Sequence, residues 1–429
     1  MTTIAKKLAQ IKPGTLLAGL DLGLDSIAAV VLDGNGQRVD RFLATQSRQG
    51  YEYLRERLQS ATRRQGACGV LVGMEPTNYY WKQVGAFLSQ ERLPFRLVNP
   101  FTVNRHREGD QLDRAKDDWR DAFMIADLLR TGKFTETELR TGAYAELQIG
   151  HATYWRLRHD RGRQVTLLTN ALRQVFPELQ QVFRDLTGQT AQALLRSVPA
   201  AAQIRQMSCA DFIGRVRQET GARRLAVGRL RKAYALAQQS IGLTEGLEAL
   251  CFDLQNSLKS ALLLDQQARQ LLSILMRAFW ILPEAPYLCS IQGLWETSAM
   301  GLLAETGDLS CYHKLKSLTK LAGTQPTPKE SGRYHRSLTP FSKQGRSRLR
   351  VVLFWATLHL LRHNDAIGYH YQRLQTRSQR PLEKMEAIGA CMNKLLAYVW
   401  ITGRNRVWYA PEIWQRLAAG PARCVSAGS

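Results

Sequence analysis

The order of β-rich and helical segments in the N-terminal part of the chain constrains its fold most. Three β-rich segments lie between Leu16 and Gln46, and a typical hairpin turn, Asp33-Gly34-Asn35-Gly36, joins the last two. Helical and β patterns then alternate: a helix over 51–64, a strand over 69–74, a helix over 79–91, a strand over 95–99 and a helix that ends near 129. This order predicts an α/β domain with three antiparallel strands first.

The same order is that of the RNase H superfamily. In that fold, acids on the first strand, at the end of the fourth strand and on the last helix converge. The chain has Asp21, Glu75, Asp118 and Asp121 at those places. Four carboxylates suit one or two Mg²⁺ (or Mn²⁺) ions, which lie about 3.5–4 Å apart in two-metal sites. Singly, each acid has an ordinary alternative, because Asp21 could lie in a turn and Glu75 could merely end a strand.

The last helix of this region carries two of the acids. At about 100° per residue, Asp118 and Asp121 share one face with the apolar residues that should turn toward the core. Unpaired carboxylates on such a face are unfavourable, so a cation is expected beside them. Alternatively, the pair lies in water at the helix N-terminus, where acids favour the helix dipole. Asp117 is four residues from Asp121 and could replace Asp118 on that face.

Length and charge narrow the function. A chain of 429 residues suggests two or three domains, and 45% hydrophobic residues allow each a sizeable core. The 59 Lys and Arg residues exceed the 36 acids and give a formal charge of +23, far from the balance of a typical cytosolic metabolic enzyme. This excess predicts a polyanionic partner.

Cysteine usage and hydropathy indicate the compartment. The seven cysteines are scattered and never spaced as Cys-x-x-Cys, so we expect reduced thiols that fill the core. The N-terminus has no apolar run typical of a signal peptide, and the longest later run, over 351–361, is short and contains Thr357 and His359. We therefore expect a soluble cytoplasmic protein without a membrane segment.

The middle of the chain has helical spacing. Between about 148 and 285, long stretches rich in Gln, Arg, Leu and Ala carry apolar residues at the intervals of a helix or a coiled coil. A plain helical subdomain and a dimerisation arm both fit this pattern. The lengths of the segments favour the arm.

The C-terminal region begins after Pro283 and Pro286. Its first segment, around Gly293, suggests two helices about a glycine turn. From 312 to 350 there are ten Lys or Arg residues against one acid, Glu330, which predicts a nucleic-acid surface. The basic residues that we expect to contact nucleic acid are Lys329, Arg333, Arg336, Lys343, Arg346, Arg348 and Arg350. Ser331 lies among them in a loop over 326–333, before a helix expected from about 346.

Several motifs together resemble the DEDD transposases of the insertion sequence one-ten group, also described as bridge-RNA-guided serine recombinases. These motifs, in order, are Asp21, Met74-Glu75-Pro76-Thr77, Lys116-x-Asp118-x-x-Asp121-Ala122, Ser331-Gly332 and Ser342-Lys343-x-Gly345-x-x-x-Leu349-Arg350. The segments Arg373 to Lys384, Lys394-Leu395-Leu396 and Trp408-Tyr409 also resemble the C-terminal end of the family. Three positions depart from the family pattern: Asp117 replaces a Thr, Gln292 a Pro and Trp295 a Gly.

The resemblance implies a three-part chain: a Holliday-junction-resolvase-like RNase H domain over 1–147, a helical coiled-coil linker over 148–285 and a transposase domain over 286–429. It implies that Asp21, Glu75, Asp118 and Asp121 hold the metal and that Ser331 is the nucleophile. It also implies donor and target DNA, an element-encoded guide RNA, assembly into dimers or tetramers, and action at the bacterial nucleoid.

The expected activity is DNA cleavage and strand exchange through a covalent phosphoserine. A hydroxyl is a poor nucleophile at neutral pH, so Ser331 would need the acids and their metal close by. Two other functions remain open from the sequence: a junction-resolving nuclease that uses water as nucleophile, and a scaffold that binds nucleic acid without catalysis.

Overall fold

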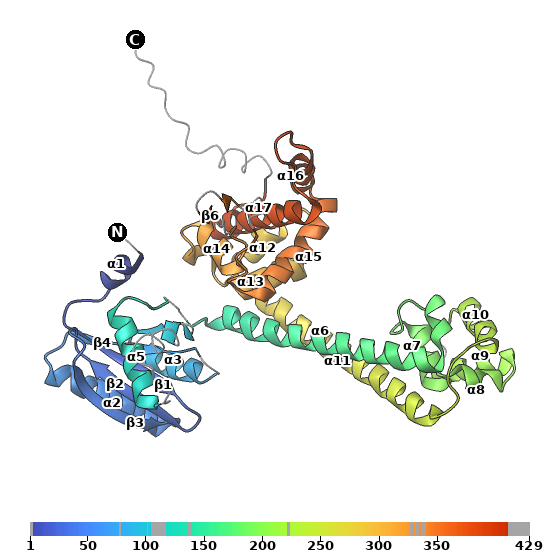
Figure 1. Ribbon diagram of the computed structural model, residues 1–429, viewed down its shortest axis with the longest axis horizontal. Coiled ribbons are helices and arrows are strands. Elements are labelled where there is room, and N and C mark those ends of the chain that lie inside the picture. The colour runs from blue at the N-terminus through green and yellow to red at the C-terminus, as the bar shows by residue number, and fades with distance from the viewer. Residues whose placement is uncertain are drawn as a thin grey trace, which may run out of the picture. The chain divides into compact units, whose positions relative to one another are not determined.

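The computed structural model of the chain is shown in Figure 1 and describes residues 3–76, 79–100, 102–103, 117–135, 139–220, 224–326, 330–331, 334–335 and 340–410. The chain divides into two compact units, Met1–Arg140 and Thr141–Ser429. The first unit is α/β, and the described part of the second is helical apart from a short β-hairpin. The predicted α/β N-terminal domain followed by a mostly helical remainder is therefore confirmed.

The first unit is built on a five-stranded sheet with the order β3-β2-β1-β4-β5. Strand β2 pairs antiparallel with both β1 and β3, whereas β4 pairs parallel with both β1 and β5. Its elements are α1 (Thr3–Leu8), β1 (Thr15–Leu22), β2 (Ser26–Leu32), β3 (Arg38–Thr45), α2 (Arg48–Arg64), β4 (Gly69–Met74), α3 (Tyr80–Gln90), β5 (Phe95–Leu97) and α5 (Asp118–Arg130). The element order predicted from hydrophobic periodicity is confirmed.

Each face of this sheet has its own core. Alternate residues of β1, such as Ala18 and Leu20, pack with leucines of α2 and α3, including Leu54 and Leu88. The residues between them face the other way, and Leu17 packs with Leu128 of α5. Because strand side chains alternate, this pattern separates a face covered by α2 and α3 from a face covered by α5.

The second unit contains a long antiparallel helix pair. Helices α6 (Gly142–Val175) and α11 (Leu247–Ile281) lie side by side in Figure 1. Gly150 of α6 lies against Leu275 of α11, and Leu172 packs in one cluster with Leu254, so the two helices run in opposite directions. The elements between them are the 3₁₀ turn η1 (Pro177–Gln181), α7 (Gln189–Ser197), α8 (Ala201–Arg205), α9 (Cys209–Thr220) and α10 (Val227–Gln238).

The C-terminal part of this unit forms a second helical core. It contains α12 (Ala285–Cys289), α13 (Glu296–Thr306), the 3₁₀ turn η2 (Leu309–Cys311), α14 (Leu315–Ala322), β6 (Glu330–Ser331), β7 (Tyr334–His335), α15 (Ser347–His363), α16 (Asp365–Thr376) and α17 (Lys384–Asn405). Leu147 and Leu275, from the two long helices, belong to this core. The long helices therefore contribute to two cores, and the division of the chain at 147 and 285 stays a prediction.

Helix hydropathy and cysteine burial bear on the expected compartment and core. Within the described residues, no helix is both long and apolar enough to cross a membrane. Cys251 and Cys391 are buried, as core-filling thiols should be, but Cys68 and Cys311 are exposed. The expectation that all cysteines fill the core is therefore wrong for these two.

Candidate active site

Two of the predicted acids lie side by side at one edge of the sheet. The parallel register of β1 and β4 pairs Leu20 with Met74. The next residue on each strand is an acid, Asp21 on β1 and Glu75 directly after β4. Since adjacent strands lie about 4.8 Å apart, this register brings Asp21 and Glu75 to neighbouring positions at the carboxyl ends of parallel strands.

Two glycines bring α5 onto these strands. A Cβ atom on Gly19 would lie 1.9 Å from the carbonyl oxygen of Ala122, and one on Gly73 would lie 2.8 Å from Cδ1 of Leu129. Only glycine allows this close approach between helix and strand. Side chains two residues apart share a face, so Asp21 and Glu75 point to the side of the sheet that α5 covers.

The start of α5 reaches the same edge. Ala122 lies over Gly19, whereas Leu128 packs with Leu17 nearer the start of β1, so α5 runs antiparallel to this strand. Asp121 directly precedes Ala122 and is 6% exposed, so the inward orientation predicted for this acid is confirmed. Asp118, one turn earlier, is exposed, so the inward orientation predicted for it is wrong: the first turn of α5 extends beyond the core that covers Asp121.

Asp117 has a local structural role. Its side chain accepts a hydrogen bond from the backbone N–H of Trp119 at 3.2 Å, and it is the N-cap of α5. Of the two residues that could have shared the acidic face, Asp118 therefore stays the candidate ligand. Within the described residues, no three His, Cys, Asp or Glu side chains form a group that could hold a metal ion. The four carboxylates are nevertheless of the type that Mg²⁺ and Mn²⁺ prefer.

The predicted nucleophile lies in the other unit. Ser331 is the last residue of β6, and its backbone pairs with Tyr334 in a hairpin of two-residue strands. The expected loop over 326–333 thus contains a short strand. Lys329, Arg333 and Arg336 lie outside the described residues. The structure groups the four acids in residues 1–140 and Ser331 in residues 141–429.

The base of the Ser331 hairpin is fixed by contacts that the sequence did not reveal. Pro326 and Phe341 form a β-bridge, and the side-chain amide of Asn393 donates to the carbonyl of Thr324 at 3.2 Å. A Cβ atom on Gly389 would lie 2.8 Å from the ring of Phe341. Helix α17 therefore supports both ends of the segment that carries Ser331. A glycine inside an apolar helical run was the only signal of this contact.

Three arginines of the predicted nucleic-acid surface have partners within the protein. Arg348 Nε donates to Glu305 Oε1 at 2.9 Å, and Arg346 donates to the backbone carbonyl of Glu305. Arg350 Nη1 donates to the carbonyls of Ala322 and Gly345. These bonds hold the start of α15 to the preceding helices. Lys343 is exposed, with its backbone in the left-handed region at a φ of 53°.

Glu305 is the centre of a buried polar network that no sequence pattern indicated. His151 Nδ1 lies 3.1 Å from Glu305 Oε1, and Trp155 Nε1 donates to His151 Nε2 at 3.0 Å. Since Nε2 accepts from the indole, the ring proton is on Nδ1 and the histidine donates to Glu305. Burial of Glu305 opposes its ionisation, but hydrogen bonds from His151 and Arg348 outweigh this effect and lower its pKa to about 2.

The predicted helical hairpin is present as α12 and α13. Gly293, at the turn between them, has a φ of 81°. Trp295, which departs from the family pattern, donates from Nε1 to His359 Nε2 on α15 at 2.9 Å. Gln292, the other departure, accepts from the side-chain amide of Asn364 at 2.8 Å through its carbonyl. Both departures thus lie where the hairpin contacts its own domain.

A second group of basic residues was also not expected from the sequence. His370 and Arg373 on α16 and Lys394 on α17 lie near one another. Burial, together with the charges of Lys394 and Arg373, lowers the pKa of His370 to about 4. Within the described residues, neither Lys394 nor Arg373 forms an ion pair. The adjacent residue Asn393 supports the Ser331 hairpin.

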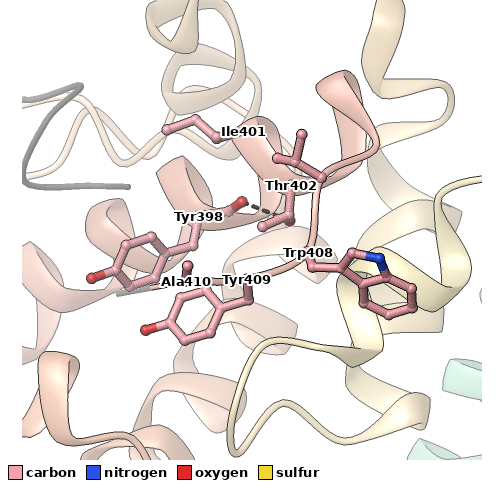
Figure 2. Close-up of a pocket in the computed structure, with 7 residues that line it drawn as sticks. Tyr398, Ile401, Thr402, Trp408, Tyr409 and Ala410 are labelled. Carbon is pink, nitrogen blue, oxygen red and sulfur yellow. Dashed lines mark hydrogen bonds between the residues drawn. The ribbon is translucent and has the colours of Figure 1, made fainter. Parts of the chain in front are cut away.

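A small cavity near the end of α17 is not a ligand site. Figure 2 shows Tyr398, Thr402, Trp408 and Tyr409 around it, with the hydroxyl of Thr402 bonded to the carbonyl of Tyr398 at 2.8 Å. Its volume of about 10 Å³ is no more than one water molecule needs.

Comparison with known proteins assigns the acids and Ser331 to two matched segments of the chain. A family model described as a transposase matches residues 18–177, and one described as "Transposase IS116/IS110/IS902 family" matches residues 285–372. The first segment contains the four acids and the second contains Ser331.

Two curated proteins are similar over most of their length. The "Mini-circle putative transposase for IS117" of Streptomyces coelicolor is 24% identical over 383 residues, which cover 84% of this chain and 87% of that protein. The "Insertion element IS900 uncharacterized 42 kDa protein" of Mycobacterium paratuberculosis is 23% identical over 318 residues, which cover 73% of this chain and 78% of that protein. The chain belongs to the IS116/IS110/IS902 family of transposases, which are DNA-processing enzymes.

Proposed function

We propose that this transposase cleaves and exchanges DNA strands by a metal-dependent reaction in which Ser331 becomes covalently bonded to DNA. The main observation in support is the neighbouring placement of Asp21 and Glu75 at one edge of a sheet, with Asp121 buried on the helix that covers that face. The strand order β3-β2-β1-β4-β5, with the first three strands antiparallel, also supports an RNase H-like domain. In such a domain, this edge is where nucleic acid is cleaved.

The acids would hold Mg²⁺ or Mn²⁺ at this edge. Such an ion, when bound, neutralises charge that develops on the scissile phosphate. Asp21 and Glu75 are fixed by strand register, and Asp121 by the contact of α5 with β1. Asp118, which is exposed, would complete the set when substrate is bound. The rigid placement of these carboxylates orients the phosphate for attack from one side.

Ser331 would supply the attacking oxygen. Its Oγ forms a bond to phosphorus, the bond between phosphorus and the leaving DNA oxygen breaks, and the hydroxyl proton passes to solvent or to a carboxylate while the leaving oxygen is protonated. The phosphoserine ester retains the energy of the phosphodiester, so strand exchange needs no external energy source. A hairpin fixed at its base by Asn393 and Phe341 presents Ser331 for this step.

The proposed reaction uses carboxylates of the first unit and the serine of the second. These groups can belong to one chain or to different protomers of a dimer or tetramer. The long pair of α6 and α11 is a candidate dimerisation arm, as its length suggests.

A second function is supported by the separation of the residues in the chain. All four acids belong to a unit that does not include Ser331. With water as nucleophile, this unit could act as a Holliday-junction-type nuclease, which would leave no protein–DNA adduct.

We also propose that donor and target DNA are selected by an element-encoded guide RNA. The formal charge of +23 supports two polyanionic partners. Purified protein should carry nuclease-protected RNA from its own locus. Recovery of random cellular RNA, with no effect on recombination, would contradict the guide.

The experiment that decides between recombinase and nuclease is adduct mapping. Ser331→Ala should abolish the covalent protein–DNA adduct and recombination while DNA binding survives, and Ser342→Ala is the matched control that should keep both. Asp121→Asn should lower the rate of cleavage by at least about a thousandfold and weaken Mn²⁺ binding. Cleavage that persists in Ser331→Ala without an adduct would support the nuclease, and wild-type recombination by this variant would exclude Ser331 as nucleophile.

A further inference from the structure

A cavity lies at the end of the sheet opposite the acids. It has a volume of about 410 Å³ and is bounded by the starts of β1 and β4 and by the segments before β1 and β5. This volume is within the range of about 300–1,000 Å³ that is usual for ligand pockets. Its floor includes Leu71 and Phe134, which belong to the apolar core under α5.

Three cations line this cavity, and its lining contains no acid. They are Lys12, Arg92 and Arg96. Within the described residues, none of the three forms an ion pair. Glu91 is the acid next to Arg92 in sequence, but it pairs with Arg55 of α2 at 3.3 Å. The cavity therefore concentrates positive charge for which the described part of the protein supplies no counter-ion, and such a cavity attracts anions.

Arg96 is the most informative of the three. It lies on the edge strand β5 between Phe95 and Leu97, which pack in the core on the side of α2 and α3. Its side chain therefore leaves the sheet on the opposite face. Nη1 donates to the carbonyl of Phe95 at 2.9 Å, but Nε is buried and has no acceptor in the described part of the chain. Buried guanidinium N–H groups rarely lack an acceptor, so a ligand oxygen at this atom would complete the site.

The walls of the cavity are held by local bonds. The hydroxyl of Thr15 donates to the carbonyl of Lys12 at 2.7 Å and lies 3.3 Å from Cys68 Sγ. Arg92 keeps its backbone in the left-handed region, with a φ of 56°, at the turn between α3 and β5. This conformation is uncommon for a residue other than glycine. It sets the position of Arg92 at the rim.

We propose that this cavity binds a phosphate group, normally one of a nucleic-acid backbone that passes the sheet at the end away from the acids. Arginine and lysine together suit phosphate, because guanidinium groups bond its oxygens in pairs and the ammonium adds a point charge. The same chemistry would hold the phosphates of a free nucleotide. The site is independent of the acids and of Ser331, so it does not depend on the proposed reaction.

The exposed thiol of Cys68 allows a direct test, because it lines the cavity. The full-length protein is alkylated with iodoacetamide in the presence of inorganic phosphate, a nucleoside triphosphate or a single-stranded oligonucleotide, and modification is followed by mass spectrometry. We expect the oligonucleotide to slow alkylation of Cys68 at least about fivefold. The partly exposed thiol of Cys209, on α9 in the other unit, is the internal control and should react at an unchanged rate.

Substitutions connect this protection to the cations. Arg96→Gln and Lys12→Gln should each abolish protection, while Arg63→Gln, at an exposed position of α2, should leave it intact. Lys12 lies in an exposed segment, so its variant tests the site even if Arg96→Gln destabilises the fold. When the binding of a single-stranded oligonucleotide is measured over a salt series, each cavity variant should reduce the slope of the log association constant against log salt concentration by about 0.7.

The outcomes separate the possible sources of phosphate. Protection by the oligonucleotide assigns a nucleic-acid backbone, and protection by the triphosphate alone assigns a free nucleotide to the same phosphate site. Equal alkylation of Cys68 with and without all three probes would overturn the proposal. Protection that persists in both cavity variants would do the same, because the anion would then be held elsewhere.

Discussion

The two regions that carry the proposed chemistry are positioned in different ways. Asp21 and Glu75 sit at the ends of paired strands, and Asp121 lies on a helix that contacts the sheet through Gly19. Ser331 belongs to a two-residue strand that pairs with β7, and its segment is anchored at the base by Thr324 and neighbouring contacts. The acids are thus built into a rigid layer, whereas the serine is on a short hairpin whose base is supported by α17. The geometry of the acids should be sensitive to packing, and that of the serine to its anchors.

The largest expected effect comes from packing at the acid edge. In Gly19→Ala, the new Cβ would overlap the backbone of Ala122, which cannot move without α5. We expect a loss of about 4 kcal/mol or more in the free energy of unfolding and at least a hundredfold loss of cleavage, because Asp121 is displaced. Urea unfolding and a cleavage assay measure both effects.

Gly389→Ala is the matched change beneath the hairpin of Ser331. There the new Cβ would meet the ring of Phe341, a side chain that can turn aside. We expect a cost of about 1–3 kcal/mol. If Gly389→Ala lowers the free energy of unfolding as much as Gly19→Ala does, the contrast between the rigid sheet edge of the acids and the supported hairpin of Ser331 is wrong.

The next effect concerns the buried network behind the basic region. Glu305→Gln removes the negative charge to which Arg348 and His151 both donate hydrogen bonds. It should destabilise the protein by about 3 kcal/mol at pH 7. The folded pKa of Glu305 is about 2 and the usual value is 4.5. The stabilisation by Glu305 is therefore full above pH 4.5 and lost as pH falls toward 2.

Glu305→Gln should accordingly flatten the fall in stability between pH 5 and pH 2.5, as measured by urea unfolding at each pH. Glu296→Gln, at an exposed position of α13, is the control and should leave the fall unchanged. An equally steep fall in Glu305→Gln would show that other carboxylates account for it.

A smaller effect distinguishes binding from structural arginines in the basic region. Lys343→Gln should weaken duplex DNA binding and reduce the slope of log K against log salt by about 0.9, with little change in stability. Arg348→Gln should lower stability and leave the salt slope of DNA binding nearly unchanged, because its guanidinium is bonded to Glu305. Fluorescence anisotropy across a salt series, paired with thermal unfolding, measures both. A full salt-slope change in Arg348→Gln with unaltered stability would return this residue to the nucleic-acid surface.

The smallest effect is expected at Asp117. Asp117→Ala removes the N-cap of α5 and should cost about 1 kcal/mol, and Asp117→Asn should restore most of it. Cleavage should survive in both variants. Loss of cleavage in Asp117→Asn, with stability retained, would make Asp117 a metal ligand in place of Asp118.

The sequence determined the elements of the first unit because their signals are local. Short β-rich, largely apolar runs indicated the strands, turn residues indicated the hairpin at 33–36, and helical spacing indicated the inward face of Asp121. The family motifs indicated the acids and Ser331. Each of these signals lies within a few residues of the feature that it predicts, so one sequence was sufficient.

Tertiary structure alone decided which polar residues meet. His151 and Glu305 are 154 residues apart, and no local pattern connects them. Arg346, Arg348 and Arg350 look like a basic surface in the sequence, yet the packing of α13, α14 and α15 gives them partners within the protein. Arg96 likewise becomes notable only once β5 is the sheet edge and its Nε is buried. Charge and periodicity are properties of a segment, but hydrogen bonding and desolvation depend on what distant segments bring to it.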